Sequence, residues 1–350
     1  MAEWVVTFWD VGQGEATDIC LPDRSHILID TGPIAGRQNP FPLWFQDVAS
    51  GVRPRIRTMI LTHTHLDHFG GALTLCADAQ QQIDTVVMPF DANVRKRGLS
   101  AVVCADENER AALGRLFALL HRRQSNTKTV FLSDPMTIYE GDGLRLKIVR
   151  NPLLEGKSIN GSGLIILLEK VMEPNHPVIV WSGDTLLHNV AEAVPNGIGG
   201  VLTGPHHGKP QDTVPDEPDD AKSAYFTDLC RRMHPQLLFV SVGSANPYEH
   251  PYRHYMIGAA QAEIATCCSE VTNQCKKLHS GHVFQGSMAL GLQPPEGACQ
   301  CRGTMRVFVS AEGGLCLDQP HHDRFMTRVK ELVPNGLCQR TLAHSQLRNK

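Results

Sequence analysis

Short apolar runs, bounded by glycine, proline and polar residues, recur along the 350-residue chain. Runs of this kind, alternating or continuous over about four to eight residues, are typical of strands with one or both faces buried. The pattern predicts two strands near the start, at 4–14 (WVVTFWDVGQG) and 26–32 (HILIDTG), joined by the turn LPDRS. It predicts further strands at IRTMILTHTH (56–65), TVVMP (85–89), LRLKIV (144–149), GLIILLE (163–169), PVIVWSGD (177–184), GGVLTGPHHG (199–208), PQLLFVSVG (235–243) and GTMRVFVS (303–310).

Two segments have the spacing of helices. Residues 103–124 place acidic side chains early and basic side chains late, as the helix dipole favours. Residues 255–268 (YMIGAAQAEIATCC) also fit a helix. Strands therefore dominate, with helices after several of them, and this order predicts an α/β fold of stacked sheets covered by helices.

Composition narrows the class of protein. The net charge is −3 and the sequence pI about 6.6, so no strong basic field indicates nucleic-acid binding. No apolar run approaches the ~20 residues that cross a bilayer, and the N-terminal segment lacks the features of a secretory signal. We therefore expect a soluble cytoplasmic protein with no membrane partner.

The residues LTHTHLDHFGG, at 61–71, gather four metal-ligand side chains at the end of a predicted strand. In an extended turn, His63 and His65 project to the same side and can reach one ion. If a helix begins near Asp67, then Asp67 and His68 turn toward a second position. Imidazole suits zinc, iron or manganese, and a carboxylate adds charge that harder ions tolerate. The spacing therefore predicts two adjacent half-sites.

Other strand ends supply the remaining ligands. Asp184 ends the strand in VWSGDT, and a carboxylate at this position can bridge two ions. His206 and His207 follow the strand in LTGPHHGK, and His250 lies in NPYEHPYRH. Asp30, at the end of ILIDTG, is predicted to orient a ligand histidine from behind.

These motifs resemble, in order, those of a known family. THTHLDH resembles the His-x-His-x-Asp-His signature of the metallo-β-lactamase fold, a four-layer αββα sandwich. FWDVGQGEA…ILIDTG, LTHTHLDHFGG, INGSGLIILLE, WSGD, GPHHGK and YEHP together resemble the metallo-hydrolase domain of the bacterial DNA-uptake competence (ComEC-like) proteins. The resemblance runs from residue 8 to about 252.

The resemblance implies a site for two divalent metal ions, zinc or manganese. His63 and His65 would bind one ion, and Asp184 would lie between the two. The other ion would be bound by Asp67, His68 and His207. By position, His206 and His250 match residues expected near a substrate phosphate.

Two departures from the family pattern bear on this assignment. Glu15 stands where the subgroup usually has aspartate after DVGQG. The third histidine of the first ion has no clear counterpart between residues 72 and 183, where His121 and His176 are poor candidates. The membrane-spanning channel of the competence proteins is also absent, so the resemblance does not imply transport.

The expected reaction is hydrolysis by a metal-activated hydroxide, with Asp67, His206 and His250 as the catalytic residues. A nucleic acid or a nucleotide is the expected substrate, which would make the protein a phosphodiesterase or nuclease. Two alternatives remain open at this stage. A lactone, thioester or β-lactam hydrolase would use the same hydroxide, and a regulatory module with an incomplete metal site would not catalyse at all.

The C-terminal part is rich in thiols. Six of the eleven cysteines fall in this one stretch, and the odd total fits reduced thiols with one metal cluster better than a disulfide framework. A structural zinc site is expected from Cys268, Cys275, Cys301 and either His279 or Cys299. Residues 1–265 are thus expected to form the hydrolase domain. Residues 266–350 would be a Cys/His-rich elaboration packed on the same domain that contributes a last strand.

Overall fold

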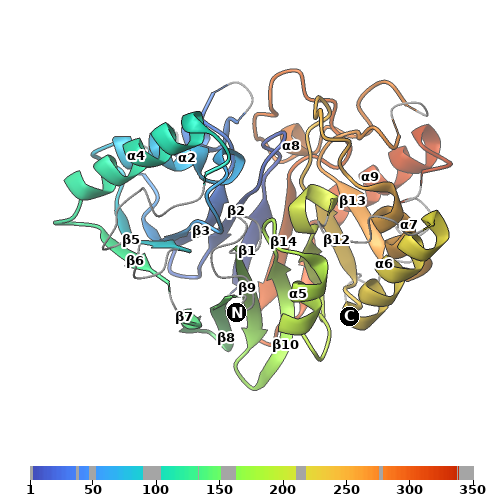
Figure 1. Ribbon diagram of the computed structural model, residues 1–350, viewed down its shortest axis with the longest axis horizontal. Helices are drawn as coiled ribbons and strands as arrows, with labels where there is room; N and C mark the ends of the chain where they lie inside the picture. The colour runs from blue at the N-terminus through green and yellow to red at the C-terminus, as the bar shows by residue number, and fades with distance from the viewer. Residues whose placement is uncertain are drawn as a thin grey trace.

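Two β-sheets lie face to face in the computed structural model, and helices cover their outer faces (Figure 1). The structure describes residues 3–36, 39–46, 53–89, 104–132, 134–150, 163–209, 218–275, 279–336 and 338. Together the sheets and helices make the four layers of the αββα sandwich, which confirms the predicted fold class.

Within the described residues, the first sheet has eight strands in the order β15-β14-β1-β2-β3-β4-β5-β6. Antiparallel strands form one side, and β3 to β6 run parallel. The strands are β1 (Glu3–Phe8), β2 (Ala16–Cys20), β3 (His26–Thr31), β4 (Ile56–Ile60), β5 (Ile83–Met88), β6 (Lys128–Phe131), β14 (Met305–Ser310) and β15 (Leu315–Leu317).

The second sheet has seven strands among the described residues, in the order β13-β12-β11-β10-β9-β8-β7. Here β10 to β13 run parallel and the remaining neighbours are antiparallel. The strands are β7 (Met136–Gly141), β8 (Leu144–Arg150), β9 (Leu164–Lys170), β10 (Glu173–Trp181), β11 (Val201–Thr203), β12 (Leu237–Val240) and β13 (Ala265–Cys268).

The apolar core divides along the same layers. One cluster fills the space between the sheets, where Val6 and Phe8 of β1 meet Ile166 and Leu168 of β9. Alternate residues of a strand face opposite sides, so the remaining apolar positions pack under the helices. Separate clusters lie under α2 and α4 and under α5, α6 and α7.

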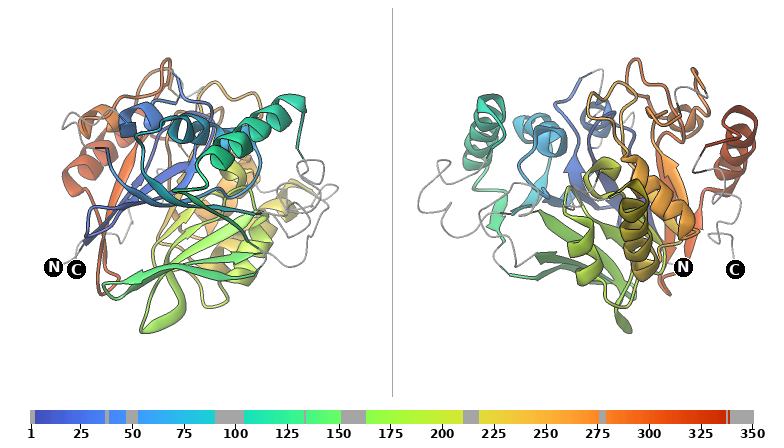
Figure 2. Two further views of the ribbon diagram at one scale, coloured as in Figure 1. Left: turned by 90° about the vertical axis from the view of Figure 1, so that its left-hand side faces the viewer. Right: turned by 45° about the vertical axis from the view of Figure 1, so that its right-hand side comes forward.

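The helices that cover the first sheet lie apart from those that cover the second (Figures 1 and 2). The first group contains α1 (Phe41–Gln46), α2 (Leu66–Ala77) and α4 (Glu107–Arg122). Over the second sheet lie α5 (Leu187–Ala193), α6 (Asp219–Met233) and α7 (Arg253–Gln261). Two further helices, α8 (Gly286–Ala289) and α9 (Gln319–Leu332), belong to the C-terminal part.

Two expectations about the elements are wrong. The strand predicted at 4–14 ends at Phe8, and the turn at 21–25 joins β3 to β2 (Ala16–Cys20), a strand that the apolar pattern did not predict. The helix predicted at 255–268 ends at Gln261, and Ala265–Cys268 forms β13 instead. β13 pairs with β12, and this pairing satisfies the backbone hydrogen bonds of a segment whose local pattern predicts a helix.

The C-terminal part joins the N-terminal sheet. The strand predicted at 303–310 appears as β14, which pairs along the whole length of β1 and continues into β15. The division of the chain at residue 265 stays a prediction. Among the described residues, no helix is long and apolar enough to cross a membrane.

Candidate metal centre

The predicted ligands lie just beyond the carboxyl ends of parallel strands, where loops from both sheets meet. Asp30 ends β3, the HTHLDH segment follows β4, Asp184 follows β10, and His206 and His207 follow β11. Carboxyl ends of parallel strands gather at one edge of a sheet, which is where α/β proteins commonly place their sites. The first sheet contributes five of these residues and the second sheet contributes three.

The glycine pair after the histidines allows α2 to approach the first sheet closely. A Cβ atom on Gly70 would lie 2.3 Å from the backbone nitrogen of Ile34, and one on Gly71 would lie 2.2 Å from the carbonyl oxygen of Thr31. Real Cβ atoms do not come so close to backbone. The first turn of α2 carries Asp67 and His68, so this approach fixes the position of both side chains.

Asp184 occupies the centre of the cluster. Its carboxylate oxygens lie 3.2 Å from His63 Nε2, 3.3 Å from His65 Nδ1 and 3.1 Å from His68 Nε2. The Nε2 atoms of His206 and His207 are each 3.6 Å away. The structure therefore brings one buried carboxylate within reach of five imidazoles.

Ligand atoms within 4.8 Å of one another form three groups among the described residues. His63, His68 and Asp184 form the first, and Asp67, His68 and His207 form the second. His68 belongs to both, so the division into separate half-sites is less sharp than the sequence suggested, and His65 lies outside all three. The third group, Glu15, Asp30 and His68, contains a residue that sequence reasoning treated only as a departure from the family pattern.

Several buried polar atoms at this position have no hydrogen-bond partner in the described part of the chain. They include His63 Nε2, Asp184 Oδ1 and Glu15 Oε1. Unsatisfied buried polar atoms are costly, and a cation that accepts their lone pairs would remove that cost. A set of imidazole nitrogens and carboxylate oxygens fits a divalent transition-metal ion.

Asp30 orients two of the histidines from behind. Its Oδ2 accepts from His68 Nδ1 at 2.7 Å and from Thr62 Oγ1 at 2.6 Å, and its Oδ1 accepts from the Thr62 amide. Thr62 Oγ1 in turn accepts from His63 Nδ1 at 3.0 Å. These bonds hold the protons on Nδ1, which leaves the Nε2 lone pairs of both rings directed into the site.

The backbone of the site is strained at three ligand-bearing positions. Asp30, His206 and His207 have φ angles of 52°, 46° and 53°, in the left-handed region that residues other than glycine adopt infrequently. His207 Nδ1 donates to the Ser241 carbonyl at 2.9 Å, which directs its Nε2 toward Asp67 and Asp184. Strain of this kind is tolerated where surrounding bonds over-determine the conformation.

We expect Asp30→Asn to weaken metal binding tenfold to hundredfold, the usual effect of removing such an outer partner. Asparagine has an NH2 group in place of one of the oxygens that now accept from His68 and Thr62. That NH2 group would donate to His68 Nδ1, so the ring proton would move to Nε2. Asparagine tolerates the positive φ, so the backbone is retained. Competition with a chromophoric chelator measures the affinity. Asp23→Asn, on an exposed turn, is the control and should leave the affinity unchanged. Unchanged metal affinity in a folded Asp30→Asn variant would contradict the orienting role of Asp30.

Burial and neighbouring charges shift the pKa values of three histidines in different directions. It is the largest cause that lowers the pKa of His206 to about 4 and that of His250 to about 3. For His207, burial is outweighed by Asp184 and Asp67, which raise the pKa to about 9. His206 and His250 are therefore neutral at pH 7, able to donate a hydrogen bond but poor as acids until an anion binds beside them.

A cleft of about 530 Å³ opens onto the cluster. Besides the predicted His65, Asp67, Asp184, His206, His207 and His250, its walls include residues that sequence reasoning did not identify: Gln13, Glu109, Lys209 and Tyr248. Gln13 lies in DVGQGE, two residues before Glu15, so this motif is the feature of the sequence that could have indicated it. Burial raises the pKa of Glu15 to about 7.

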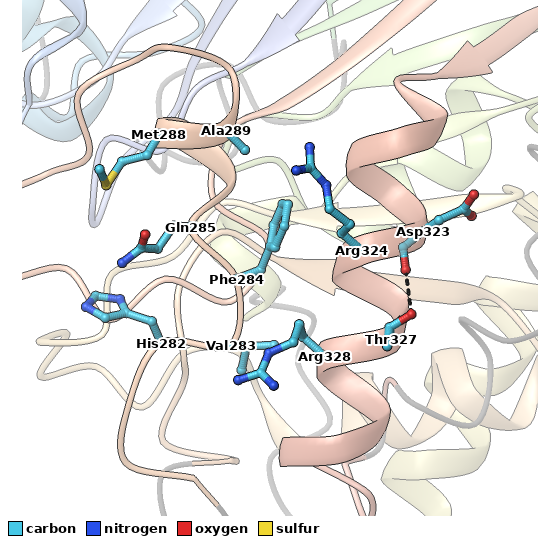
Figure 3. Close-up of a pocket in the computed structure, with 10 residues that line it drawn as sticks. All are labelled: His282, Val283, Phe284, Gln285, Met288, Ala289, Asp323, Arg324, Thr327 and Arg328. Atoms are coloured by element: carbon cyan, nitrogen blue, oxygen red, sulfur yellow. Dashed lines mark hydrogen bonds between the residues drawn. The ribbon is translucent and has the colours of Figure 1, made fainter.

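Other residues considered from sequence lie elsewhere. His121 in α4 and His176 in β10 are exposed and take no part in the cluster. A larger cavity of about 790 Å³ lies between α9 and the segment around α8, with Phe284, Arg324 and Arg328 on its walls (Figure 3). It contains none of the predicted ligands.

Comparison with known proteins adds a family match. The sequence model of the metallo-beta-lactamase superfamily matches residues 9–83, which include β2 to β4 and the first ligand segment. No curated protein matches the chain significantly.

Solved structures with a similar fold include Igni18, a metallo hydrolase from Ignicoccus hospitalis (12% identity, TM-score 0.41, 77% of this chain and 97% of that one). YhfI from Bacillus subtilis, a metallo-beta-lactamase fold protein, is similar at 9% identity, TM-score 0.42 and the same coverage. A variant of the CmlA beta-hydroxylase is similar at 15% identity and TM-score 0.41 over 73% of this chain, which spans about half (49%) of that protein. The superfamily model thus matches the segment that carries the first ligands, and the two-sheet structure is consistent with the αββα sandwich of that superfamily.

Proposed function

We propose that the protein is a metal-dependent phosphodiesterase or nuclease that acts on a nucleic acid or a nucleotide. The observation that carries the proposal is the composition of the cleft. A cation, Lys209, and two neutral imidazoles, His206 and His250, line the same cleft as the carboxylates Asp67 and Asp184. The motif likeness to the competence proteins supports the same substrate class.

In this proposal Asp184 and His68 would hold divalent ions together with His63, Asp67 and His207. When bound, such ions supply a hydroxide at neutral pH and stabilise charge on phosphoryl oxygens. The carboxylates of the site set the affinity for the cations, and Asp30 keeps the rings oriented. No serine or cysteine nucleophile is required by this arrangement.

The chain's own residues would position the substrate. Gln13 Nε2 lies 3.4 Å from His250 Nδ1, and donation to this atom leaves the ring proton on Nε2, where it can bond a phosphoryl oxygen. Lys209 Nζ donates to the Tyr248 carbonyl at 3.3 Å, so its charge stays beside the cleft. A lysine there attracts an anionic substrate. Tyr248, 60% exposed, offers a ring against which a base can stack.

The test is a panel of substrates assayed with the protein loaded with manganese or zinc. We expect turnover of bis(p-nitrophenyl) phosphate and of single-stranded DNA, abolished by a chelator and by Asp67→Asn. Asp142→Asn, a change on an exposed turn, is the matched control and should keep full activity. Intact activity in Asp67→Asn would overturn the proposal.

Two other results would each replace the proposal with a different function. Turnover of a chromogenic lactone or thioester, without phosphodiester cleavage, would assign the hydroxide to another bond. No activity, with less than one tightly bound ion per chain at the Asp184 cluster, would indicate a regulatory module. One observation favours the second result. Within the described residues, no histidine between residues 72 and 183 joins His63 and His65 as a third ligand.

A further inference from the structure

We propose that a structural zinc ion binds beyond the carboxyl end of β13, apart from the hydrolase site, held by four thiols: Cys268, Cys275, Cys301 and Cys338. Three of these residues are expected from sequence, and the fourth emerges from the fold. All eleven cysteines lie in the described residues, and none forms a disulfide.

Cys268 and Cys301 lie on neighbouring extended segments. The Arg302 amide donates to the Cys268 carbonyl at 2.9 Å, and the Cys301 amide donates to the Ser269 carbonyl at 2.9 Å. An antiparallel bridge between Glu270 and Gln300 continues this pairing. The thiols of Cys268 and Cys301 are both buried and interact electrostatically with each other. The pairing therefore supplies two ligands from fixed backbone.

Cys275 and Cys338 approach this pair from a turn and from the segment beyond α9. The thiols of both interact electrostatically with Cys268 and with Cys301. The Thr272 amide donates to Cys275 Sγ at 3.2 Å, and Cys275 Sγ donates to the Thr272 carbonyl at 3.3 Å. The sequence left His279 or Cys299 as the fourth ligand. Cys338 is the better candidate because it approaches both members of the fixed pair.

Arg302 provides an independent indication of negative charge at this position. Its side chain is fully buried, with the guanidinium 5.7 Å from the ring centres of both Phe284 and Phe325. Its Nε and Nη2 have no hydrogen-bond partner among the described residues, Nη1 donates to the Thr304 carbonyl at 3.4 Å, and the guanidinium interacts electrostatically with Cys267, Asp318 and Cys301. A buried cation whose donors are only partly satisfied is unfavourable. A zinc ion with four thiolates carries two negative charges and would compensate it.

The four thiols must draw closer together to bind an ion. In the described part of the chain no three Sγ atoms lie within 4.8 Å of one another. Cys275 and Cys338 are only partly buried, on a turn and after a helix end, so they are the ligands that would shift toward Cys268 and Cys301. Thiolates in a closed tetrahedral site select zinc, and such a site stabilises the surrounding fold.

The test uses the full chain with the hydrolase ligands removed, Asp67→Asn/His68→Asn, so that retained metal reports the second site alone. We expect about one zinc per chain by elemental analysis and, after cobalt exchange, a thiolate-to-cobalt charge-transfer band. Adding Cys338→Ser or Cys301→Ser should remove both signals. Adding Cys104→Ser or Cys316→Ser, thiols outside the cluster, should leave both unchanged.

A second measurement avoids dependence on the folding of variants. Titrating the natural sequence with an organomercurial should release one zinc per chain into a chromophoric chelator as the thiols react. The absence of thiol-bound zinc, or a disulfide among the four thiols by intact mass, would overturn the proposal. Loss of the ion in His279→Asn with retention in Cys338→Ser would also overturn this ligand set.

Discussion

Asp184→Asn should reduce hydrolysis at least about a thousandfold, equivalent to roughly 4 kcal/mol of transition-state stabilisation. The carboxylate is within 3.6 Å of five imidazole nitrogens and is 1% exposed. Asparagine keeps the shape but removes the one charge at the centre of the cluster. The remaining ligands would then hold fewer cations, so bound metal should fall together with kcat.

The measurement combines kcat on the best substrate of the panel with elemental analysis of the same preparation. Asp84→Asn is the matched control, since that carboxylate pairs with Arg55 at the surface, far from the cleft. It should change neither quantity. If Asp184→Asn kept its metal and its rate, this carboxylate would not bind the ions, and the central role assigned to it would be wrong.

Gly71→Ala should destabilise the fold by about 2 kcal/mol or more, because overpacking against rigid backbone outweighs the gain in helix propensity. Alanine inside α2 would by itself gain about 1 kcal/mol relative to glycine. However, the added Cβ would meet the Thr31 carbonyl oxygen at 2.2 Å and the Pro42 ring at 2.7 Å. Neither can move without displacing β3 or α1 from α2.

Chemical denaturation measures the free energy of unfolding, and activity should fall as well since α2 carries Asp67 and His68. The control is Gly36→Ala, at a position where a Cβ meets nothing within 4 Å. That variant should be neutral to slightly stabilising. Equal stability of the two variants would show that α2 can shift away from the sheet, and that the glycine pair does not fix its position.

Much of the candidate site could be predicted because its ligands follow recognisable strands. His63 to His68 are adjacent in sequence, and Asp184 and His207 each follow an apolar run that forms a central parallel strand. The convergence of such strand ends is a property of the fold class, so the sequence pattern predicts it.

The remaining features depend on partners that are distant in the chain. β2 has the sequence ATDIC, too polar to be recognised as a strand, and becomes one by pairing with β1 on one side and β3 on the other. Lys209 enters the cleft only through the turn after β11. Cys338 is too far from Cys301 in the sequence for a short motif to link them. Only the path of the chain through α9 brings the two toward each other.

The pairing of β1 with β14 has a consequence for how the protein is made. In the sheet, β1 lies between β2 and a strand about 300 positions later in the chain, aligned from Glu3 with Ser310 to Phe8 with Met305. Until that late segment emerges, β1 presents an open edge of apolar residues, the kind of surface that recruits other chains. Nascent chains that stall before β14 are therefore natural clients for a chaperone, whereas chains that include β14 shield the edge themselves.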